Sequence, residues 1–350
     1  MGGIVFGFLT SLVITTMAIP SIVTVARSKN LYDKPQGRKP RRKELPTLGG
    51  LAIFAGTVIS LTLFCHVSEF PELPYVTAGA MILFFIGIKD DILMIAPWWK
   101  LTGQVLAATI ISVLAGMRVP LPGIMAGLGQ PGLVVSTVIT ILLVVCFINS
   151  FNLIDGIDGL ASGIGMISSG LLAWIFLLSG LREYALLSSV LMGSLLGFFY
   201  FNVISRKKKI LMGDTGALMV GFVSSIMVLR FLALEKPALA GFQISSPQSL
   251  ALAIFIIPLA DMFRVVGIRI WRGKSPFQPD RLHIHYRLID LGLKHWQVTA
   301  MLLFFNVLMV FCALILQDLG EIKLSLTLIL VTVFMYILEW FLTKRRKIAC

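Results

Sequence analysis

The stretch Asn149–Gly163, which reads NSFNLIDGIDGLASG, decides how the rest of the chain is interpreted. Long apolar runs lie on both sides of it, yet it carries Asn149, Asn152, Asp155 and Asp158 at a constant spacing of three. At 3.6 residues per turn such a row drifts about 60° at each step, so its members cannot share one narrow helix face. The alternative is a capped helix end before a solvated turn, but a cap needs only one Asp or Asn. We therefore predict a helix end that opens into a glycine-rich turn, where the polar side chains converge.

The composition is that of an integral membrane protein. The 350 residues are 57% hydrophobic and only 13% charged, with a mean hydropathy of +0.92. Such a chain is expected to cross a bilayer repeatedly. The net charge of +13 could indicate nucleic-acid binding. The basic residues lie in short loops between apolar runs, however, which is typical of membrane topology and argues against a nucleic-acid partner.

The apolar runs predict an all-α polytopic membrane protein with 10–11 transmembrane helices in a single domain, residues 1–350. The eleven expected spans are roughly 4–25, 48–66, 75–89, 101–117, 132–150, 160–179, 184–204, 213–232, 248–268, 298–316 and 323–343.

Alternating the loops between two sides places 25 of the 30 Lys and Arg residues on one side. The positive-inside rule makes that side cytoplasmic, with the N-terminus outside and the C-terminus inside. We expect the active site at this face, formed by the cytoplasmic loops 26–47, 89–100, 149–159, 205–212 and 264–297.

The acidic residues follow the same partition. The acids in the cytoplasmic loops or at cytoplasmic span ends include Asp33, Asp90, Asp91, Asp155, Asp158, Asp214, Asp261 and Asp280. An ion-coupled transporter is expected to keep some carboxylates near the middle of the membrane. Acids in one layer at the membrane surface instead favour an enzyme that acts on a lipid head group.

Two further acidic motifs indicate a cation and phosphates. Asp90 and Asp91 are adjacent, and they repel each other unless a cation or a shared proton intervenes. Asp214 lies between glycines at an expected helix start, where backbone N–H groups favour phosphate. Considered alone, Asp90 and Asp91 could belong to a solvated turn, and Asp214 could be the N-cap residue of a helix. Oxygen ligands without cysteine suit Mg²⁺ or Mn²⁺, and neighbouring Lys and Arg suit phosphates.

His283 and His285 are two residues apart, which is not the helical spacing of a zinc site, so we interpret them as phosphate ligands or proton handlers. A hard cation among carboxylates at a membrane surface, surrounded by basic groups, predicts phosphoryl transfer that involves a lipid phosphate.

Across about residues 30 to 297 the chain resembles the polyprenyl-phosphate N-acetylhexosamine-1-phosphate transferase family, and within it the WecA/TagO-type enzymes. The resemblance rests on motifs that occur in order along the chain. They are Asp33-Lys-Pro-Gln-Gly-Arg38, Asp90-Asp91, Asn149-x-x-Asn152-x-x-Asp155-Gly-x-Asp158-Gly, Phe201-Asn202, Met212-Gly-Asp214-Thr-Gly216, Ser275-Pro-Phe277 and Asp280-Arg-x-His-Ile-His285.

The resemblance implies transfer of a sugar 1-phosphate from a UDP-sugar to undecaprenyl phosphate, with Mg²⁺ as cofactor, Mn²⁺ as a substitute and UMP as product. Asp90 or Asp91 would deprotonate or position the lipid phosphate. The metal would be held by Asp214, with Asn152, Asp91 or Asp155 nearby. The nucleotide side would be formed by Asp158, Asn202, Lys100 and Leu211. Phosphates and sugar would face Arg264, Arg281, His283, His285, Asp33, Lys34 and Arg38.

Two positions depart from the family pattern. Arg41 and Tyr286 stand where relatives often have histidine, so we infer that neither missing histidine is the essential base. The His-Ile-His-Tyr order favours UDP-N-acetylglucosamine as the donor, since the muramoyl branch typically has three consecutive histidines. The alternative activity is the transfer of phospho-N-acetylmuramoyl-pentapeptide. The alternative from another class of protein is a membrane transporter or scaffold.

The resemblance implies a bacterial cytoplasmic (inner) membrane enzyme that starts a cell-envelope polysaccharide. The sequence leaves open direct attack or a covalent phospho-enzyme, and a monomer or a homodimer.

Overall fold

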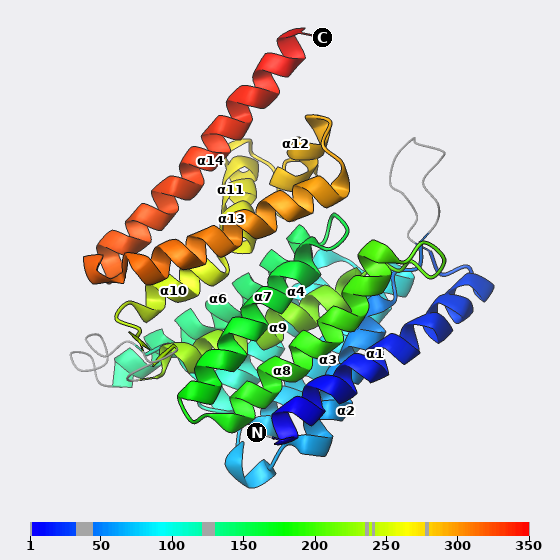
Figure 1. Ribbon diagram of the computed structural model, residues 1–350, viewed down its shortest axis with the longest axis vertical. Helices are drawn as coiled ribbons and strands as arrows, with labels where there is room; N and C mark the ends of the chain where they lie inside the picture. Colours follow the sequence, from blue (N-terminus) through cyan, green and yellow to red (C-terminus); the bar gives the residue numbers. More distant parts are fainter. Residues whose placement is uncertain are drawn as a thin grey trace.

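The computed structural model describes residues 2–32, 45–120, 130–234, 238–239, 242–276 and 280–349, and its architecture is helical (Figure 1). The helices are α1 (Gly2–Ser28), α2 (Gly49–Phe64), α3 (Leu73–Leu93), α4 (Pro97–Thr109), α6 (Gln130–Ile154), α7 (Leu160–Leu178), α8 (Arg182–Phe199), α9 (Gly213–Leu232), α10 (Pro247–Ile254), α11 (Ile256–Trp271), α12 (Ile284–Asp290), α13 (His295–Ile315) and α14 (Glu321–Ala349).

Shorter elements join or extend these helices. Two are 3-10 turns, Val67–Glu69 and Gln317–Leu319, and two are π turns that continue α4 and α8, Ile110–Leu114 and Tyr200–Ile204. The two-residue strands β1 (Ala238–Leu239) and β2 (Phe242–Gln243) pair antiparallel.

Helix α9 forms the centre of the bundle. It packs against α2, α3, α6 and α7. Of its apolar 18-residue stretch, 89% is buried inside the protein. Helices α1 and α8 pack together on one side, whereas α10 to α14 form a second group from which α14 extends to the C-terminus (Figure 1). Because α9 is enclosed by other helices, its first residues are held from several directions.

In the described part of the chain, seven helices are long and apolar enough to cross a membrane, or eight if the bent pair α10–α11 is one span. This confirms the predicted all-α, multi-pass class. Each of the eleven predicted spans falls on a helix or a helix pair. Three of these helices, α2, α3 and α4, are not among those that are long and apolar enough to cross a membrane. The count of eleven and the orientation therefore stay predictions.

The span predicted at 248–268 is not one continuous helix, because α10 and α11 meet at a bend of 75°. Pro258 explains the break: a proline lacks the N–H that would bond the carbonyl four residues earlier, and its ring clashes with that carbonyl. The carbonyl in question belongs to Ile254, and it accepts a hydrogen bond of 3.0 Å from Nδ2 of the buried Asn306 instead. The bend directs α11 away from the axis of α10 and toward the loop that carries the histidines.

Glycines bring α2 and α3 against the first turn of α9. A Cβ atom on Gly50 would lie 2.0 Å from the backbone nitrogen of Gly216, and one on Gly87 would lie 2.5 Å from Cα of Thr215. Any larger residue would force these backbones apart. This close packing places the C-terminal end of α3, which carries Asp90 and Asp91, beside Asp214.

Candidate active site

The stretch Asn149–Gly163 forms the predicted helix end and turn, but its polar side chains do not converge, because Asn149 pairs with Gln104 and Asp158 pairs with Lys209. Helix α6 ends at Ile154, residues 155–159 form turns, and α7 begins at Leu160. Gly159 has φ +80°, a conformation that costs glycine little and other residues more. The side chains that follow Ile154 therefore leave the helical row and point toward different neighbouring elements.

Four carboxylates and one lysine gather beside this turn, and we call Asp90, Asp91, Asp155 and Asp214 the acidic cluster. Lys100, at the start of α4, lies between two of them. Its Nζ is 2.7 Å from Oδ2 of Asp90 and 2.5 Å from Oδ2 of Asp214. The ammonium group thus bridges α3 and α9.

Asp91 caps the first turn of α9 from a different helix. Its Oδ1 accepts the N–H of Asp214 at 2.7 Å, and its Oδ2 accepts the N–H and the hydroxyl of Thr215 at 3.1 and 2.6 Å. Helix N-termini leave such N–H groups without partners inside the helix. Gly213 has φ +73°, and a Cβ there would lie 2.1 Å from the carbonyl of Thr47. Asp91 therefore fixes where Asp214 points.

The acidic cluster carries more negative charge than its surroundings compensate. Burial, followed by the charge of Asp214, raises the pKa of Asp91 to about 7. The same two causes raise the pKa of Asp90, against the influence of Lys100. Burial and the neighbouring acids raise the pKa of Asp155 well above its usual range, although the Gly213 N–H opposes this. Burial disfavours charge on Lys100, but Asp214 and Asp90 together raise its pKa.

The residues predicted for the nucleotide side lie along the same turn. Lys209 Nζ is 2.5 Å from Oδ2 of Asp158. The buried amide of Asn202 accepts the N–H of Gly159 at 2.7 Å and donates to the carbonyl of Ile210 at 2.9 Å. Asn202 therefore joins the turn to the loop that carries Lys209.

Leu211 is held through its backbone, because its N–H donates to the carbonyl of Pro46 at 2.8 Å and its carbonyl accepts the N–H of Gly49 at 3.0 Å. Its neighbour Met212 accepts the N–H of Gly50 at 2.8 Å. Leu211 thus connects the loop after α8 to the start of α2.

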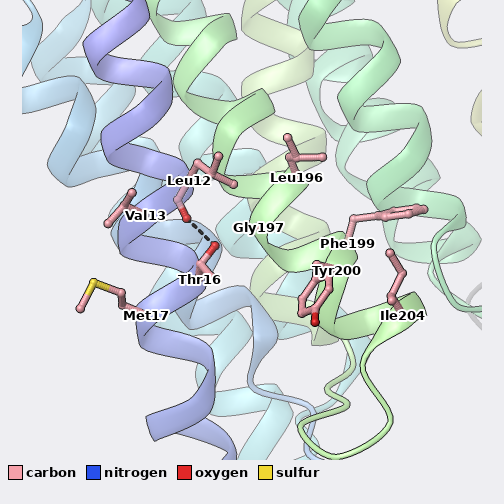
Figure 2. Close-up of a pocket in the computed structure, with 9 residues that line it drawn as sticks. All are labelled: Leu12, Val13, Thr16, Met17, Leu196, Gly197, Phe199, Tyr200 and Ile204. Carbon is pink, nitrogen blue, oxygen red and sulfur yellow. Dashed lines mark hydrogen bonds between the residues drawn. The ribbon is translucent and has the colours of Figure 1, made fainter.

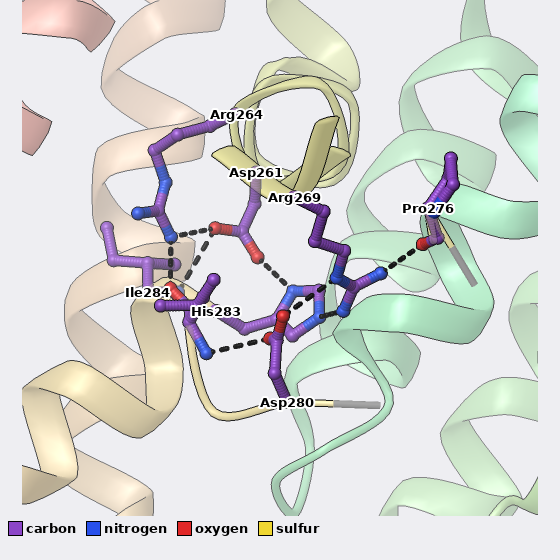
Figure 3. Close-up of polar contacts among 8 residues, drawn as sticks. Asp261, Arg264, Arg269, Pro276, Asp280, His283 and Ile284 are labelled. Carbon is purple, nitrogen blue, oxygen red and sulfur yellow. Dashed lines mark hydrogen bonds and ion pairs between the residues drawn. The ribbon is translucent and has the colours of Figure 1, made fainter. Parts of the chain in front are cut away.

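A second polar group lies between α11 and α12, and we call Asp261, Arg264, Arg269, Asp280 and His283 the histidine network (Figure 3). The fully buried Asp261 is 2.8 Å from Nη2 of Arg264 and 2.8 Å from Nδ1 of His283. The other ring nitrogen of His283 is 3.4 Å from Nη2 of Arg269. Arg269 also pairs with Asp280 at 2.8 Å, which keeps the pKa of Asp280 low despite its partial burial. Both nitrogens of His283 are thus engaged within the protein.

His285 differs from His283 in having no hydrogen-bond partner for either ring nitrogen among the described residues. Its side chain is fully buried, and burial lowers its pKa to about 3, so the ring is neutral at pH 7. It lies against the turn after α6, since a Cβ on Gly156 would be 2.2 Å from its Nε2. His285 is therefore the contact between the two polar groups.

The remaining residues predicted for the site are Arg264, Arg281, Asn152, Asp33, Lys34 and Arg38. Arg264 also donates to the carbonyl of Leu282 at 2.6 Å and lies over the ring of Tyr336 at 4.7 Å. Arg281 is 62% exposed and pairs with Asp290, and Asn152 is half-buried at the end of α6. Asp33, Lys34 and Arg38 lie outside the described residues.

Sequence reasoning missed several residues that the structure brings to the site. They are Gln104, Lys209, Thr215, Asp261 as a partner of His283, and Arg269. The spacing of Asp261 and Arg264, three apart on one helix, could have indicated their ion pair. The contacts made by Gln104 with Asn149, and by Lys209 with Asp158, join segments 45 and 51 residues apart, for which the sequence offers no signal.

Within the described residues, no three or more His, Cys, Asp or Glu side chains are already arranged around a point where a metal ion could bind. The donor chemistry of the acidic cluster nevertheless fits a hard cation, since every carboxylate is an oxygen ligand. The raised pKa values of Asp90, Asp91 and Asp155 also indicate unmet negative charge, which a divalent cation would compensate.

Carboxylates and a lysine gathered at the end of α3 and the start of α9 of a helical bundle suit phosphate-bearing substrates, and the sequence comparisons show that the class is a glycosyl transferase. Residues 73–232 match the family described as glycosyl transferase family 4. The chain belongs to this family, because curated relatives are at least 30% identical to it over most of both lengths.

One such relative is the probable undecaprenyl-phosphate N-acetylglucosaminyl 1-phosphate transferase of Bacillus subtilis, 32% identical over 96% of this chain and 91% of that protein. Another is the decaprenyl-phosphate N-acetylglucosaminephosphotransferase of Mycobacterium leprae, 30% identical over 84% and 79%. A third is the undecaprenyl-phosphate alpha-N-acetylglucosaminyl 1-phosphate transferase of Yersinia pestis, 30% identical over 79% and 74%.

Proposed function

We propose that this protein transfers N-acetylglucosamine 1-phosphate from UDP-N-acetylglucosamine to undecaprenyl phosphate, giving undecaprenyl-diphosphate N-acetylglucosamine and UMP. The names of the relatives support the donor sugar and the class of lipid acceptor. The observation in this chain that carries the proposal is Lys100 between Asp90 and Asp214, beside two further carboxylates with raised pKa values. Such a site suits two phosphate-bearing substrates together with a cation.

In the proposed reaction an oxygen of the lipid phosphate attacks the sugar-bearing phosphorus of the donor. A new phosphorus–oxygen bond forms there, the bond to the bridging oxygen breaks, and UMP departs with the electron pair. Both reactants are anionic, so positioning and charge compensation supply most of the catalysis. Lys100 would hold phosphate oxygens when they displace the carboxylates that it now contacts.

Asp90 and Asp91 would have different roles in this reaction. Asp91 accepts three hydrogen bonds from Asp214 and Thr215 and is therefore suited to position Asp214. Asp90 accepts the N–H of Ile95 with one oxygen and contacts Lys100 with the other. Its pKa is raised by burial and by the charge of Asp214, which suits a group that takes or shares the proton of the lipid phosphate. We assign Asp90 that role.

Mg²⁺ would be held by Asp214 with Asp155, Asp91 or Asn152, and when bound it would compensate the charge of the phosphate oxygens. Asp158, Lys209 and the backbone beside Leu211 would contact the nucleotide. The neutral His285 would offer a ring nitrogen to a substrate polar group, whereas His283 would hold the loop in place. We propose that these groups face the cytoplasm from a bacterial inner membrane.

The test is UMP release by the purified protein with undecaprenyl phosphate and a panel of UDP-sugars. We expect turnover with UDP-N-acetylglucosamine, little with UDP-glucose, which lacks the N-acetyl group, and little with UDP-N-acetylmuramoyl-pentapeptide. A site whose polar groups pair with the correct substrate discriminates against analogues that leave them unpaired. Comparable kcat/KM for the N-acetylglucosamine and muramoyl donors would overturn the assignment of the donor. No release of UMP from any donor would overturn the reaction.

A further inference from the structure

An apolar groove lies on the surface between α1 and α8, away from the acidic cluster and the histidine network (Figure 2). Its volume is about 580 Å³, and its walls include Val13 and Met17 from α1, and Gly197, Tyr200 and Ile204 from α8 and its π turn. Met17 is 72% exposed and Ile204 is 61% exposed. Side chains of this kind, at this level of exposure, require an apolar occupant.

The floor of the groove offers no free polar group to its occupant. The hydroxyl of Thr16 donates back to the carbonyl of Leu12 at 2.7 Å and is therefore used within α1. Gly197 has no side chain, and a Cβ there would lie 3.0 Å from that hydroxyl. The two helices approach closely at this point, and the groove above them is bounded by hydrocarbon apart from the hydroxyl of Tyr200.

A basic loop lies beyond one end of the groove. After Ile204 the chain continues into Arg206-Lys207-Lys208-Lys209. Nη2 of Arg27 donates to the carbonyl of Lys207 at 2.8 Å, and Nζ of Lys208 donates to the hydroxyl of Thr24 at 3.1 Å. These contacts hold the basic loop against α1 without neutralising Arg27 or Lys208, because no acidic group is a partner in either contact.

The apolar wall and the α1 contacts of the basic loop lie along one face of α1. Positions 13, 17, 24 and 27 follow a helical repeat, so their side chains lie above one another. From Val13 to Thr24 the helix rises about 16 Å, which is close to half of the roughly 30 Å hydrocarbon core of a bilayer. The groove with the basic loop beyond it therefore matches the depth of one membrane leaflet.

We propose that this groove binds an anionic phospholipid, with an acyl chain against Val13, Met17 and Tyr200 and the phosphate head group at Arg27, Lys207 and Lys208. Basic pockets between membrane helices attract anionic head groups. The acceptor substrate is not the occupant that we infer, because its phosphate has to reach Asp90 and Asp214. Lys209, in the same basic loop, pairs with Asp158 instead. A lipid held at Lys207 and Lys208 thus steadies the loop that reaches the active-site turn.

The test measures retained lipid by native mass spectrometry after equilibration with phosphatidylglycerol or phosphatidylcholine of the same acyl chains. We expect the wild-type protein to retain phosphatidylglycerol at least fivefold more than phosphatidylcholine. The double variant Lys207→Gln/Lys208→Gln should lose that preference. The matched control Arg272→Gln/Lys274→Gln, which removes two exposed basic residues elsewhere, should keep it.

A second pair of variants tests the apolar part of the groove without changing charge. Val13→Trp would fill the groove and should reduce phosphatidylglycerol retention severalfold. Val138→Trp, on α6 and outside the groove, should not, although the two valines are 52% and 50% exposed. Equal retention of the two phospholipids by the wild-type protein would overturn the proposal. So would displacement of phosphatidylglycerol by equimolar undecaprenyl phosphate, which would identify the groove as the acceptor's.

Discussion

The acidic cluster and the histidine network meet at the turn after α6, yet their charges are compensated in opposite ways. In the histidine network, Asp261 and Asp280 each contact an arginine, and His283 uses both ring nitrogens. In the acidic cluster, the one lysine contacts two of the four carboxylates, Asp90 and Asp214, and three of the four have raised pKa values. The carboxylates of the network are each paired with an arginine, although Nε of Arg264 is buried with no partner among the described residues, whereas the cluster lacks positive charge.

This difference indicates which group acts on substrate and which supports it. Perturbed pKa values gather at functional sites, because binding and catalysis need groups that the fold alone does not satisfy. A closed network of buried charges is costly to assemble but fixes one geometry when every member is paired. We therefore expect the acidic cluster to determine turnover and the histidine network to determine stability and the position of His285.

The largest effect on turnover is expected from Asp214→Asn. This change removes a carboxylate that contacts Lys100 while leaving the N–H that Asp91 accepts. We expect kcat to fall by at least about 10²-fold, as for the loss of a catalytic group, and activation by Mg²⁺ to weaken. UMP release over a Mg²⁺ titration measures both. Near-normal activity with unchanged Mg²⁺ dependence would remove Asp214 from the site, and Asp290→Asn, at an exposed pair, serves as the control.

The histidine network is expected to yield the largest effect on stability. Asp261→Ala leaves Arg264 and His283 buried without their carboxylate, and breaking a buried ion pair typically costs about 3–5 kcal/mol. Thermal unfolding in detergent, followed by circular dichroism, measures the loss. Should Asp261→Ala unfold within a degree of wild type while kcat falls as far as in Asp214→Asn, the division of roles between the two groups would be wrong.

Changing the pH should sharpen the comparison. The pKa of Asp91 lies above its value in the unfolded chain, so its contribution to stability is present at low pH and is lost as the pH rises through about 7. Without Mg²⁺, we expect the melting temperature to fall between pH 5.5 and pH 8, and added Mg²⁺ to restore more of it at pH 8.

Metal binding to a protonated carboxylate releases a proton, so the apparent affinity for Mg²⁺ should drop up to about tenfold for each pH unit below pH 7.

Asp91→Asn removes this titrating group, so its melting temperature should depend less on pH than that of the wild-type protein. A melting temperature of the wild-type protein that rises steadily from pH 5.5 to pH 8 without Mg²⁺ would contradict the inference of unmet negative charge.

Gly156→Ala tests the contact between the two groups. Its new methyl group would meet Nε2 of His285, so either the ring or the turn has to move. Overpacking of this kind typically costs about 1–3 kcal/mol. We expect a moderate loss of stability and a larger relative loss of kcat/KM. Gly267→Ala, in α11, where the added carbon has no atom within 4 Å apart from the local helix backbone, is the matched control and should leave both unchanged or slightly improve stability. Equal behaviour of the two variants would separate His285 from the site.

The smallest effect on stability is expected at the exposed pair of Arg281 and Asp290. Their 2.9 Å contact is solvent-exposed, and such pairs contribute about 0–1 kcal/mol. Arg281→Gln should therefore unfold like the wild-type protein but raise KM for the donor if the guanidinium contacts phosphate or sugar. Asp290→Asn breaks the same pair from its other side and should leave KM unchanged. A KM that rises equally in both variants would show that the pair supports the loop and does not contact the donor.

Much of the class of this protein could be predicted from its sequence, because membrane helices follow from local composition. Apolar runs long enough to cross a bilayer cannot form another stable structure there, so the all-α class needs no knowledge of tertiary contacts. The turn after Ile154 was also predictable, since glycines and a polar row of period three cannot continue a membrane helix. The bend between α10 and α11 was missed, although Pro258 was its local signal.

Only the tertiary structure decided what each polar residue does. Asp90 and Asp91 are adjacent in sequence, but one contacts Lys100 and the other caps α9, because α3 ends beside α9 at glycine contacts that no local pattern encodes. His283 and His285 are the same residue type two positions apart. Both ring nitrogens of His283 have hydrogen-bond partners, whereas neither ring nitrogen of His285 has one among the described residues. Composition and periodicity determine which segments cross the membrane, since each segment's burial depends on its own side chains. The role of a charged group depends on the partners that distant segments bring to it, and those are fixed only when the helices pack.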